Sequence, residues 1–298
     1  MHILILGGSG QLGLCLAEYC QNHSIPFTAL DRSALDITLA SQPHAVIQQI
    51  QPSAVINACA YTYVDEAETS SHAAFQVNQM GPHNLAKACE DLSIPLIHVS
   101  TDYVFDGLAS SPYAPNHSTN PINEYGRSKL AGELEIQKHC KSYFIVRTSS
   151  VFSEHGKNFL KTILGLLSSQ KQIKIISNQY IAPTYAKDLA EALVLIAIKA
   201  PAQTIPSQIY HYAGNMPCSW YDFAKAIMEE ASNLHHSLTT ELIPIPYDNF
   251  PQTASRPIYS PLDSSNILLD FGMEPSDWMN AIPKIIQTLE INADNLHE

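Results

Sequence analysis

HILILGGSGQLG, residues 2–13, is the stretch that decides the fold. Its first five residues are a largely apolar run that predicts a buried strand, and a helical pattern continues beyond the glycines to about residue 21. Gly7, Gly10 and Gly13 fit a tight turn in which the backbone and the start of a helix approach a pyrophosphate. The order of strand, glycine turn and helix therefore predicts a dinucleotide-binding site at the beginning of the chain.

Asp31 and Arg32 follow the next predicted strand, residues 26–30. A carboxylate at this place can accept a hydrogen bond from an adenosine ribose hydroxyl, and an arginine can bind a 2′-phosphate. The same pair could be a solvated ion pair in an ordinary turn at the end of a strand. The residues therefore leave NADPH and NADH both open as the cofactor.

Strands and helices continue to alternate as far as residue 105. Helices are predicted at residues 39–50 and 73–92, and strands at residues 54–57 and 95–99. This alternation favours right-handed crossovers and a Rossmann-type, doubly wound parallel sheet, so the predicted fold class is α/β. Residues 1–150 are therefore assigned to a dinucleotide-binding domain.

Beyond residue 152 the strict alternation ends. Helices are predicted at residues 157–167, 186–198 and 219–231, with Ser219 as the cap of the last, and a strand at residues 209–212. Prolines between residues 244 and 261 predict an irregular stretch over the cleft. Residues 151–298 are assigned mainly to a smaller, mixed α/β substrate domain, with some segments returning to the first domain.

Composition limits the classes of function. The chain has 298 residues, of which 45% are hydrophobic and 15% charged, which is typical of a globular protein with a large core. Sixteen Lys and Arg against 28 Asp and Glu leave a formal charge of −12. Partners that are nucleic acids or acidic membranes are not expected, because like charges repel.

The cysteines and histidines indicate neither disulfides nor a metal. Six cysteines are scattered without the spacing of a zinc site, and His235-His236 lacks a second pair of ligands, so no metal is expected. The start of the chain lacks the features of a signal peptide, and the apolar run at residues 192–198 is too short to cross a bilayer. A cytoplasmic protein with reduced thiols is the expectation.

NEYGRSK, residues 123–129, is the stretch that carries chemistry. On a helix, Tyr125 and Lys129 share a face, and a nearby ammonium would lower the pKa of the phenol and make it a proton donor near neutral pH. Ser100 and Thr101 follow the fourth predicted strand and could hold a substrate carbonyl beside Tyr125. The short motif is also common in surface turns, and such hydroxyl pairs often cap helices or form turns.

Seven stretches in one order resemble the extended short-chain dehydrogenase/reductases, specifically the dTDP-4-dehydrorhamnose reductase family. They are GGSGQLG at 7–13, LDRSALDIT at 30–38, INACAYTYVDEAE at 56–68, STDYVFDG at 100–107, YGRSKLAGE at 125–133, VRTSSVF at 146–152 and ASRPIYSPLDSS at 254–265. The resemblance covers nearly the whole chain.

The resemblance implies roles for individual residues. The catalytic residues would be Thr101, Tyr125 and Lys129, and the substrate-binding residues would be Thr101, Asp102, Ser150 and Arg256, with Arg256 on the diphosphate. The cofactor would be bound by Gly7, Gly10, Gln11, Leu12, Gly13, Asp31, Arg32, Asp36, Ile37, Ala60, Tyr61, Thr62, Ser100, Tyr125 and Lys129. Ser150 stands where the family commonly carries an aromatic side chain, and Ile181 where it carries a glycine, so a roomier and more polar sugar pocket is expected.

The implied activity is the NADPH- or NADH-dependent reduction of the C4 keto group of a nucleotide-linked 4-keto-6-deoxy sugar, most simply dTDP-4-dehydro-L-rhamnose to dTDP-L-rhamnose. Its partner would be the nucleotide sugar, and a homodimer is compatible with it. One alternative is a non-catalytic, NADP-binding regulatory subunit resembling that of methionine adenosyltransferase. Another is a related epimerase or dehydratase, although Asp102 is followed by Tyr103 where a dehydratase carries a second acid.

Overall fold

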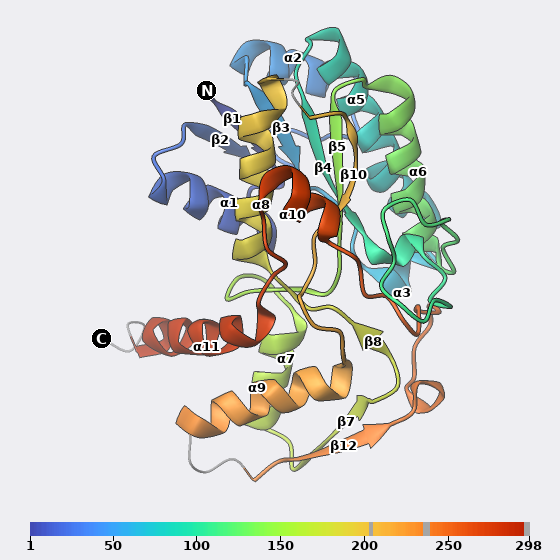
Figure 1. Ribbon diagram of the computed structural model, residues 1–298, viewed down its shortest axis with the longest axis vertical. Helices are drawn as coiled ribbons and strands as arrows, with labels where there is room; N and C mark the ends of the chain where they lie inside the picture. Colours follow the sequence, from blue (N-terminus) through green and yellow to red (C-terminus); the bar gives the residue numbers. More distant parts are fainter. Residues whose placement is uncertain (203–204, 235–238, 295–298) are drawn as a thin grey trace.

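A parallel sheet of six strands organises the larger part of the molecule in a computed structural model that describes residues 1–202, 205–234 and 239–294 (Figure 1). The strand order is β2-β1-β3-β4-β5-β10. The predicted doubly wound α/β fold is confirmed, because the chain builds outward from β1 on one side and then, from β3, on the other. The strands are β1 (Ile3–Leu6), β2 (Phe27–Leu30), β3 (Ala54–Asn57), β4 (Leu96–Thr101), β5 (Tyr143–Thr148) and β10 (Gln208–His211).

Helices cover both faces of this sheet (Figure 1). Ile3 and Ile5 of β1 belong to the apolar cluster on one face, whereas Leu4 and Leu6 belong to the cluster on the other. This two-residue alternation places one core on each side of the strands. The first face is covered by α1 (Gln11–Asn22), α8 (Ala186–Lys199) and α10 (Ser265–Phe271), and the second by α2 (Gln42–Ile50), α5 (Gly81–Asp91) and α6 (Glu124–His139).

The helix predicted at residues 73–92 is divided into three parts. A short helix α4 (Ser71–Phe75) continues into a π-helical turn η1 (Gln76–Met80), which leads into α5. The turn carries the buried Asn78, whose amide bonds both backbone groups of Tyr61. A π-turn inserts a residue into the helical repeat, and here it directs an amide inward that a regular helix would turn elsewhere. A further short helix, α3 (Val64–Ala67), precedes this segment.

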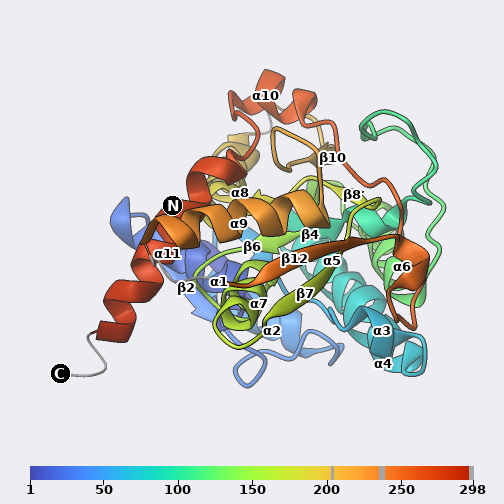
Figure 2. The ribbon, with the colours of Figure 1, turned by 90° about the horizontal axis from the view of Figure 1, so that it is seen from below.

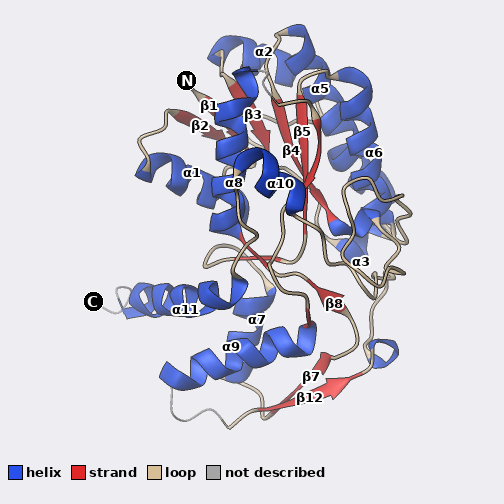
Figure 3. Ribbon diagram, viewed as in Figure 1, coloured by secondary structure: helices blue, strands red, loops and turns tan. Residues whose placement is uncertain are grey.

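A smaller part lies below the carboxyl ends of the strands and contains α7 (Phe159–Leu167), α9 (Trp220–Leu234) and α11 (Trp278–Asp294) (Figures 1 and 3). Its own apolar core is centred on side chains of α7, α9 and α11, such as Leu160, Phe223 and Ile282. Ser219 caps α9 as predicted, since its hydroxyl accepts from the Asp222 amide at 3.0 Å. Three two-stranded sheets complete this part: β7 (Gln172–Ile176) with β12 (Glu241–Ile245), β8 (Tyr180–Ile181) with β11 (Cys218–Ser219), and β6 (Val151–Phe152) with β9 (Thr184–Tyr185).

The prediction of an irregular stretch between residues 244 and 261 was wrong at its beginning. Pro244 lies inside β12, which pairs in parallel with β7 (Figure 2). A strand with a single neighbour tolerates proline, because a residue whose N–H faces away from the pair has no ladder bond to lose. The following residues are irregular apart from a short 3-10 turn, η4 (Tyr247–Asn249).

No helix among the described residues is both long enough and apolar enough to cross a membrane. The six cysteines are all free. His235 and His236, for which solvent exposure was expected, lie outside the described residues.

Candidate active site

The glycine turn lies at the point where the strand order reverses, between β1 and β3. Gly7 has a positive φ of 83°, and a Cβ there would come within 3.0 Å of the Ala58 carbonyl carbon. A Cβ on Gly13 would lie 2.1 Å from the Gly7 carbonyl oxygen, so α1 packs against the turn only because residue 13 is glycine. Open parallel sheets bind ligands at such a reversal, outside the carboxyl ends of their strands.

The start of α1 fits a phosphate group. Gly10 precedes the helix, and no side chain caps the first amides of α1. Uncapped amides and the positive end of the helix dipole are the features that bind pyrophosphate in dinucleotide sites. Gln11 fixes the turn to the smaller part of the molecule, because its amide donates to the Val151 carbonyl at 3.1 Å and accepts from Asn158 at 2.8 Å. Leu12 is partly buried against the core.

The predicted adenosine-binding residues lie beyond β2. Asp31 accepts from the Ser33 amide and hydroxyl and from the Ala34 amide, and these bonds hold its pKa below the usual value. The Arg32 side chain is 78% exposed and forms an ion pair with Asp36 at 3.1 Å. Its guanidinium is therefore free to turn toward a phosphate at little cost. The side chain of Ile37 is buried against α5, where a Cβ on Gly81 would meet it at 2.5 Å.

The predicted nicotinamide side consists of Ala60, Tyr61 and Thr62, which follow β3. Asn78 holds this segment with two hydrogen bonds, accepting from the Tyr61 amide at 2.8 Å and donating to the Tyr61 carbonyl at 3.0 Å. It also donates to the Ser128 hydroxyl on α6. One buried amide therefore connects the π-turn, the loop after β3 and the helix that carries Tyr125.

Helix α6 brings Tyr125 to the carboxyl end of β4. Asn123 caps the helix by accepting from the Gly126 amide at 2.7 Å. A Cβ on Gly126 would lie 2.2 Å from the Tyr103 carbonyl oxygen, so glycine allows this close approach. Thr101, which ends β4, is close enough to Tyr125 to affect the pKa of its phenol. The Ser100 hydroxyl is buried and has no partner among the described residues.

The expected lowering of the Tyr125 pKa was wrong for the protein without ligands. Burial raises the pKa of Tyr125 to about 12, a hydrogen bond from Thr101 opposes the shift, and the nearby Asp102 adds to it. The Lys129 side chain was expected to face the phenol. Lys129 instead donates to the Val99 carbonyl at 2.7 Å and lies 3.4 Å from His98 Nε2.

Asp102 connects the end of β4 with the segment after β5. Its carboxylate accepts from the Thr101 hydroxyl at 3.1 Å and from the Ser149 hydroxyl at 2.9 Å. Burial raises the pKa of Asp102 to about 6, against the opposing effect of hydrogen bonds from Ser260, Ser149 and Thr101. Ser150, next along the chain, has a positive φ of 46°, and its carbonyl accepts from the Thr184 amide.

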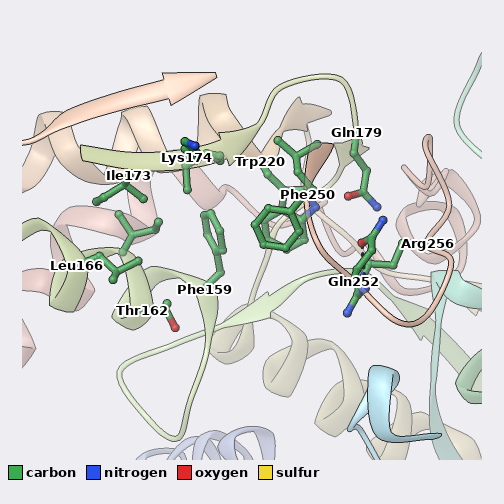
Figure 4. A pocket seen from close by; sticks show the side chains of 13 residues that line it. Phe159, Thr162, Leu166, Ile173, Lys174, Gln179, Trp220, Phe250, Gln252 and Arg256 are labelled. Atoms are coloured by element: carbon green, nitrogen blue, oxygen red, sulfur yellow. Dashed lines mark hydrogen bonds between the residues drawn. The ribbon is translucent and has the colours of Figure 1, made fainter. Parts of the chain in front are cut away.

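Arg256 lines a pocket of about 300 Å³ in the smaller part (Figure 4). Its guanidinium is paired with Asp65 through two contacts of 2.6 and 3.1 Å, and it also interacts with Tyr103, whose ring touches that of Tyr125. Figure 4 shows Gln179, Gln252 and Arg256 at one end of the pocket, aromatic side chains in its middle, and Leu166, Ile173, Thr162 and Lys174 at the other end. The lining residues include Phe159, Leu166, Ile173, Lys174, Trp220 and Phe250.

Comparison with known proteins identifies the family. The model of the RmlD substrate binding domain matches residues 1–291. A dTDP-4-dehydrorhamnose reductase of Aggregatibacter actinomycetemcomitans is 39% identical over 95% of this chain and 98% of its own length. A spore coat polysaccharide biosynthesis protein of Bacillus subtilis is 33% identical over 96% of each chain. The chain belongs to the dTDP-4-dehydrorhamnose reductase family.

Solved structures of the family share the whole fold. A dTDP-4-dehydrorhamnose reductase of Bacillus anthracis, solved in complex with NADP, superimposes with a TM-score of 0.89 at 32% identity, covering 96% of this chain and 99% of that one. The family reductase of Clostridium acetobutylicum gives 0.90 at 31% identity, covering 97% and 100%. The resemblance read from the seven stretches is therefore confirmed.

Sequence reasoning missed three residues that build the site of this reductase family member. Asn78 lies in the helix predicted at residues 73–92, His98 in the strand predicted at residues 95–99, and Asp65 in the matching stretch at residues 56–68, and no role was predicted for any of the three. Asn78 and His98 are buried polar residues on elements with apolar patterns. A polar residue within such a pattern is visible in the sequence and indicates a buried hydrogen bond. Asp65 offers none, because its partner Arg256 is 191 residues away.

Proposed function

We propose that this protein uses NADPH or NADH to reduce the C4 keto group of a nucleotide-linked 4-keto-6-deoxy sugar, with dTDP-4-dehydro-L-rhamnose as substrate and dTDP-L-rhamnose as product. The observation that carries the proposal is the meeting of Thr101 and Tyr125 at the carboxyl end of β4, the strand next to β3 on the same edge of the sheet as the glycine turn. The family relatives and the NADP complex of one of them support it.

The residues present fit the cofactor. The glycine turn leaves room for backbone to approach a pyrophosphate, the first amides of α1 are uncapped, and a buried Ser100 hydroxyl has no described partner near the nicotinamide side. When bound, the nicotinamide supplies the hydride that adds to the C4 carbon. Asp31, Arg32, Asp36 and Ile37 would hold the adenosine end, and Ala60, Tyr61 and Thr62 the other.

Tyr125 is proposed as the proton donor in the reduction. As the C4 carbonyl becomes an alkoxide, Tyr125 transfers its hydroxyl proton to the oxygen, and Thr101 donates a hydrogen bond to the same oxygen. A phenol whose pKa is about 12 can still do this, because an alkoxide is a far stronger base than a phenolate. Lys129 would bind the cofactor ribose, and Tyr125 would recover a proton from solvent after product leaves.

The pocket beside Arg256 is proposed to receive the nucleotide. Its aromatic side chains offer faces for a base, and Arg256 can bind a diphosphate through two parallel hydrogen bonds. The sugar would then lie between Arg256 and Tyr125, near Asp102 and Ser150. In this proposal residues 1–150 would mainly bind the cofactor and residues 151–298 would mainly bind the nucleotide.

The remaining parts of the proposal concern assembly and compartment. A homodimer is the simplest closed assembly, and a cytoplasmic location agrees with six free thiols. The mass of the purified protein in solution tests the dimer, because a monomeric mass at assay concentration would exclude it.

The deciding experiment incubates purified protein with dTDP-4-dehydro-L-rhamnose and either NADPH or NADH and follows loss of the reduced cofactor. Tyr125→Phe should lower kcat by about 10²–10⁴-fold with little change in cofactor affinity, because it removes one proton and almost no surface. Tyr143→Phe, at the far end of β5, is the matched control and should keep the parent rate. Turnover by Tyr125→Phe at the parent rate would refute the assigned role, and no turnover by the parent protein would favour a non-catalytic, cofactor-binding protein.

A further inference from the structure

A chain of buried hydrogen bonds runs from the loop after β3 to Lys129. The Cys59 amide donates to Asn57 Oδ1 at 3.1 Å, and Asn57 Nδ2 lies 2.9 Å from His98 Nδ1. His98 Nε2 lies 3.4 Å from Lys129 Nζ, which in turn donates to the Val99 carbonyl at 2.7 Å. Asn57 and His98 are fully buried and Lys129 is 2% exposed, so no solvent competes for these bonds.

The Cys59 amide fixes the direction of the bonds in this chain. A backbone amide can only donate, so the atom of Asn57 that faces it is the oxygen, and the nitrogen of Asn57 faces His98. An amide nitrogen can only donate as well, so His98 Nδ1 must accept. A neutral imidazole has one proton, and with Nδ1 accepting, that proton sits on Nε2. Burial holds the pKa of His98 well below its usual value, which agrees with a neutral ring.

The Nε2–H of His98 consequently points at the amine of Lys129. A charged ammonium has three donors and no acceptor, so it cannot accept this proton, whereas an uncharged amine has a lone pair that can. The amine keeps an N–H for the Val99 carbonyl in either state. Two donors facing each other at 3.4 Å in a dry interior would be unfavourable, and the uncharged amine avoids that arrangement.

We propose that His98, held by Asn57 as the Nε2–H tautomer, is a positioning residue that favours the uncharged amine of Lys129 in the free protein, so that in alkaline solution Lys129 takes up a proton when the dinucleotide binds. The inference rests on the proposed function only in taking Lys129 as the ribose-binding residue. The step is balanced, because the amine gains one proton from solvent and becomes an ammonium. Negative charge and hydroxyl acceptors brought by the dinucleotide favour the ammonium.

The charged groups around Lys129 set the pH range of this state. With a pKa of about 8 the ammonium prevails at pH 7, and the uncharged amine prevails only above about pH 8. Burial lowers the pKa of Lys129 to about 8, and Glu133 on the same helix and Cys59 after β3 act in the opposite direction. The strand β4 contributes His98, and α6 contributes Tyr125, four residues before Lys129. Glu133 is neutralised by a bidentate ion pair with Arg147, at 2.6 and 2.9 Å, which weakens its pull on Lys129.

The first test measures the tautomer directly, by long-range ¹H–¹⁵N NMR of the parent protein with labelled histidine. His211 is an internal control, because its Nδ1 faces the Tyr113 carbonyl at 2.9 Å and must carry the proton there. His98 should show the Nε2–H pattern and His211 the Nδ1–H pattern. In Asn57→Asp, a carboxylate would face both neighbours, so His98 should change to the Nδ1–H pattern while His211 is unchanged. An Nδ1–H tautomer of His98 in the parent protein would overturn the proposal.

The second test measures proton uptake when NADPH binds, by calorimetry in buffers of different ionisation enthalpy. A group with a pKa of about 8 is only about one-tenth charged at about pH 9, so up to ~0.9 proton should be taken up per NADPH. Lys129→Met should abolish the uptake, and Asn57→Asp should reduce it because Lys129 is already charged. No uptake by the parent protein, or equal uptake by a folded Asn57→Asp, would refute the proposal. Neither measurement uses a sugar, so absence of reductase activity would leave both results interpretable.

Discussion

The buried carboxyl of Asp102 illustrates how much a single residue depends on its surroundings. Sequence named it as a substrate contact, and the structure makes it a junction between β4 and the Ser149 segment. Burial raises its pKa to about 6, so the folded protein binds the proton of this carboxyl more tightly than the unfolded protein does. The contribution of Asp102 to the free energy of unfolding is therefore complete below the unfolded pKa of about 3.9, and it is lost as the pH rises through about 6.

Asp102→Asn should accordingly remove a pH-dependent penalty. The free energy of unfolding of the variant minus that of the parent should rise by up to ~3 kcal/mol between pH 4 and pH 7. The reason is that the variant forms no buried charge as the pH rises. Urea unfolding of both proteins from pH 4 to pH 7 measures the change. Parallel pH profiles would mean that the carboxylate is fully compensated by its three hydroxyl donors.

A wider sugar pocket is expected because Ser150 stands where the family commonly has an aromatic side chain. Its side chain is small and its positive φ of 46° is uncommon outside glycine, so the backbone here is set by the Thr184 contact. Ser150→Trp should restore an aromatic face and raise activity on the rhamnose precursor relative to bulkier 4-keto-6-deoxy sugars. A panel of such sugar nucleotides, assayed with parent and variant, measures this. If the parent already prefers the rhamnose precursor and the variant gains nothing, the pocket is not altered.

At the level of single residues, sequence predicts spacing well and environment poorly. The four-residue interval of Tyr125 and Lys129 correctly placed both on one helix, because helical periodicity is local. The pKa of Tyr125 was predicted in the wrong direction, because Lys129 faces His98 and Val99, which are about 30 residues earlier in the chain. The roles of the site residues themselves stay predictions until the variants are assayed.

Among the elements, α6 is the one whose local sequence most directly positions site residues, because it contains Tyr125 and Lys129. Asn123 accepts from the Gly126 amide and also donates to the Ser255 carbonyl, so the cap fixes both the helix and the loop that carries Arg256. The strands β1 to β4 and the helices α1, α2, α7, α8 and α9 were predicted within a few residues, whereas β5 and α11 were not predicted. The π-turn at residues 76–80 was not, because an inserted residue leaves the amphipathic pattern of the surrounding helix almost unchanged.

Asn123→Ala should cost about 0.5–2 kcal/mol of stability and also lower kcat, since the first turn of α6 contains Tyr125. Ser219→Ala at the start of α9 is the matched control, because it removes a cap of the same kind far from Tyr125. Urea unfolding and steady-state kinetics are measured for both. An equal fall in kcat for the two variants would show that general destabilisation, and not the position of α6, causes the loss.

On the scale of the whole molecule, the two parts are expected to bind different ligands. Arg256→Ala should weaken dTDP about tenfold or more, as expected for loss of a charge-assisted hydrogen bond of about 1.5–3 kcal/mol, and leave NADPH affinity unchanged. Arg32→Ala should weaken NADPH more than NADH and leave dTDP unchanged. Calorimetric titration measures the affinities of dTDP, NADPH and NADH for each of the two variants. Loss of both ligands in either variant would contradict the division.

The first four strands of the larger sheet were predictable because they alternate with helices along the chain, and each βαβ unit has one preferred hand. The strand β5 was not predicted, and the predicted strand at residues 209–212 was not assigned to this sheet. The smaller part was not predictable, because its pairs join segments far apart in sequence. β7 and β12 pair over a separation of about 69 residues, as the contact between Gln172 and Glu241 shows. The ion pair of Asp65 and Arg256 was not predicted for the same reason, because the two residues are 191 positions apart.

The edge strand β10 also has a consequence for synthesis. Its partner β5 ends at Thr148, and β10 begins at Gln208, so roughly 60 residues must be translated between them. At about 5–20 residues per second this takes about 3–12 s. During that interval the nascent chain has β5 as an open edge and lacks α8 over one apolar face, which are conditions that favour aggregation. A ribosome-bound chain is therefore expected to need chaperone protection until β10 has emerged from the exit tunnel.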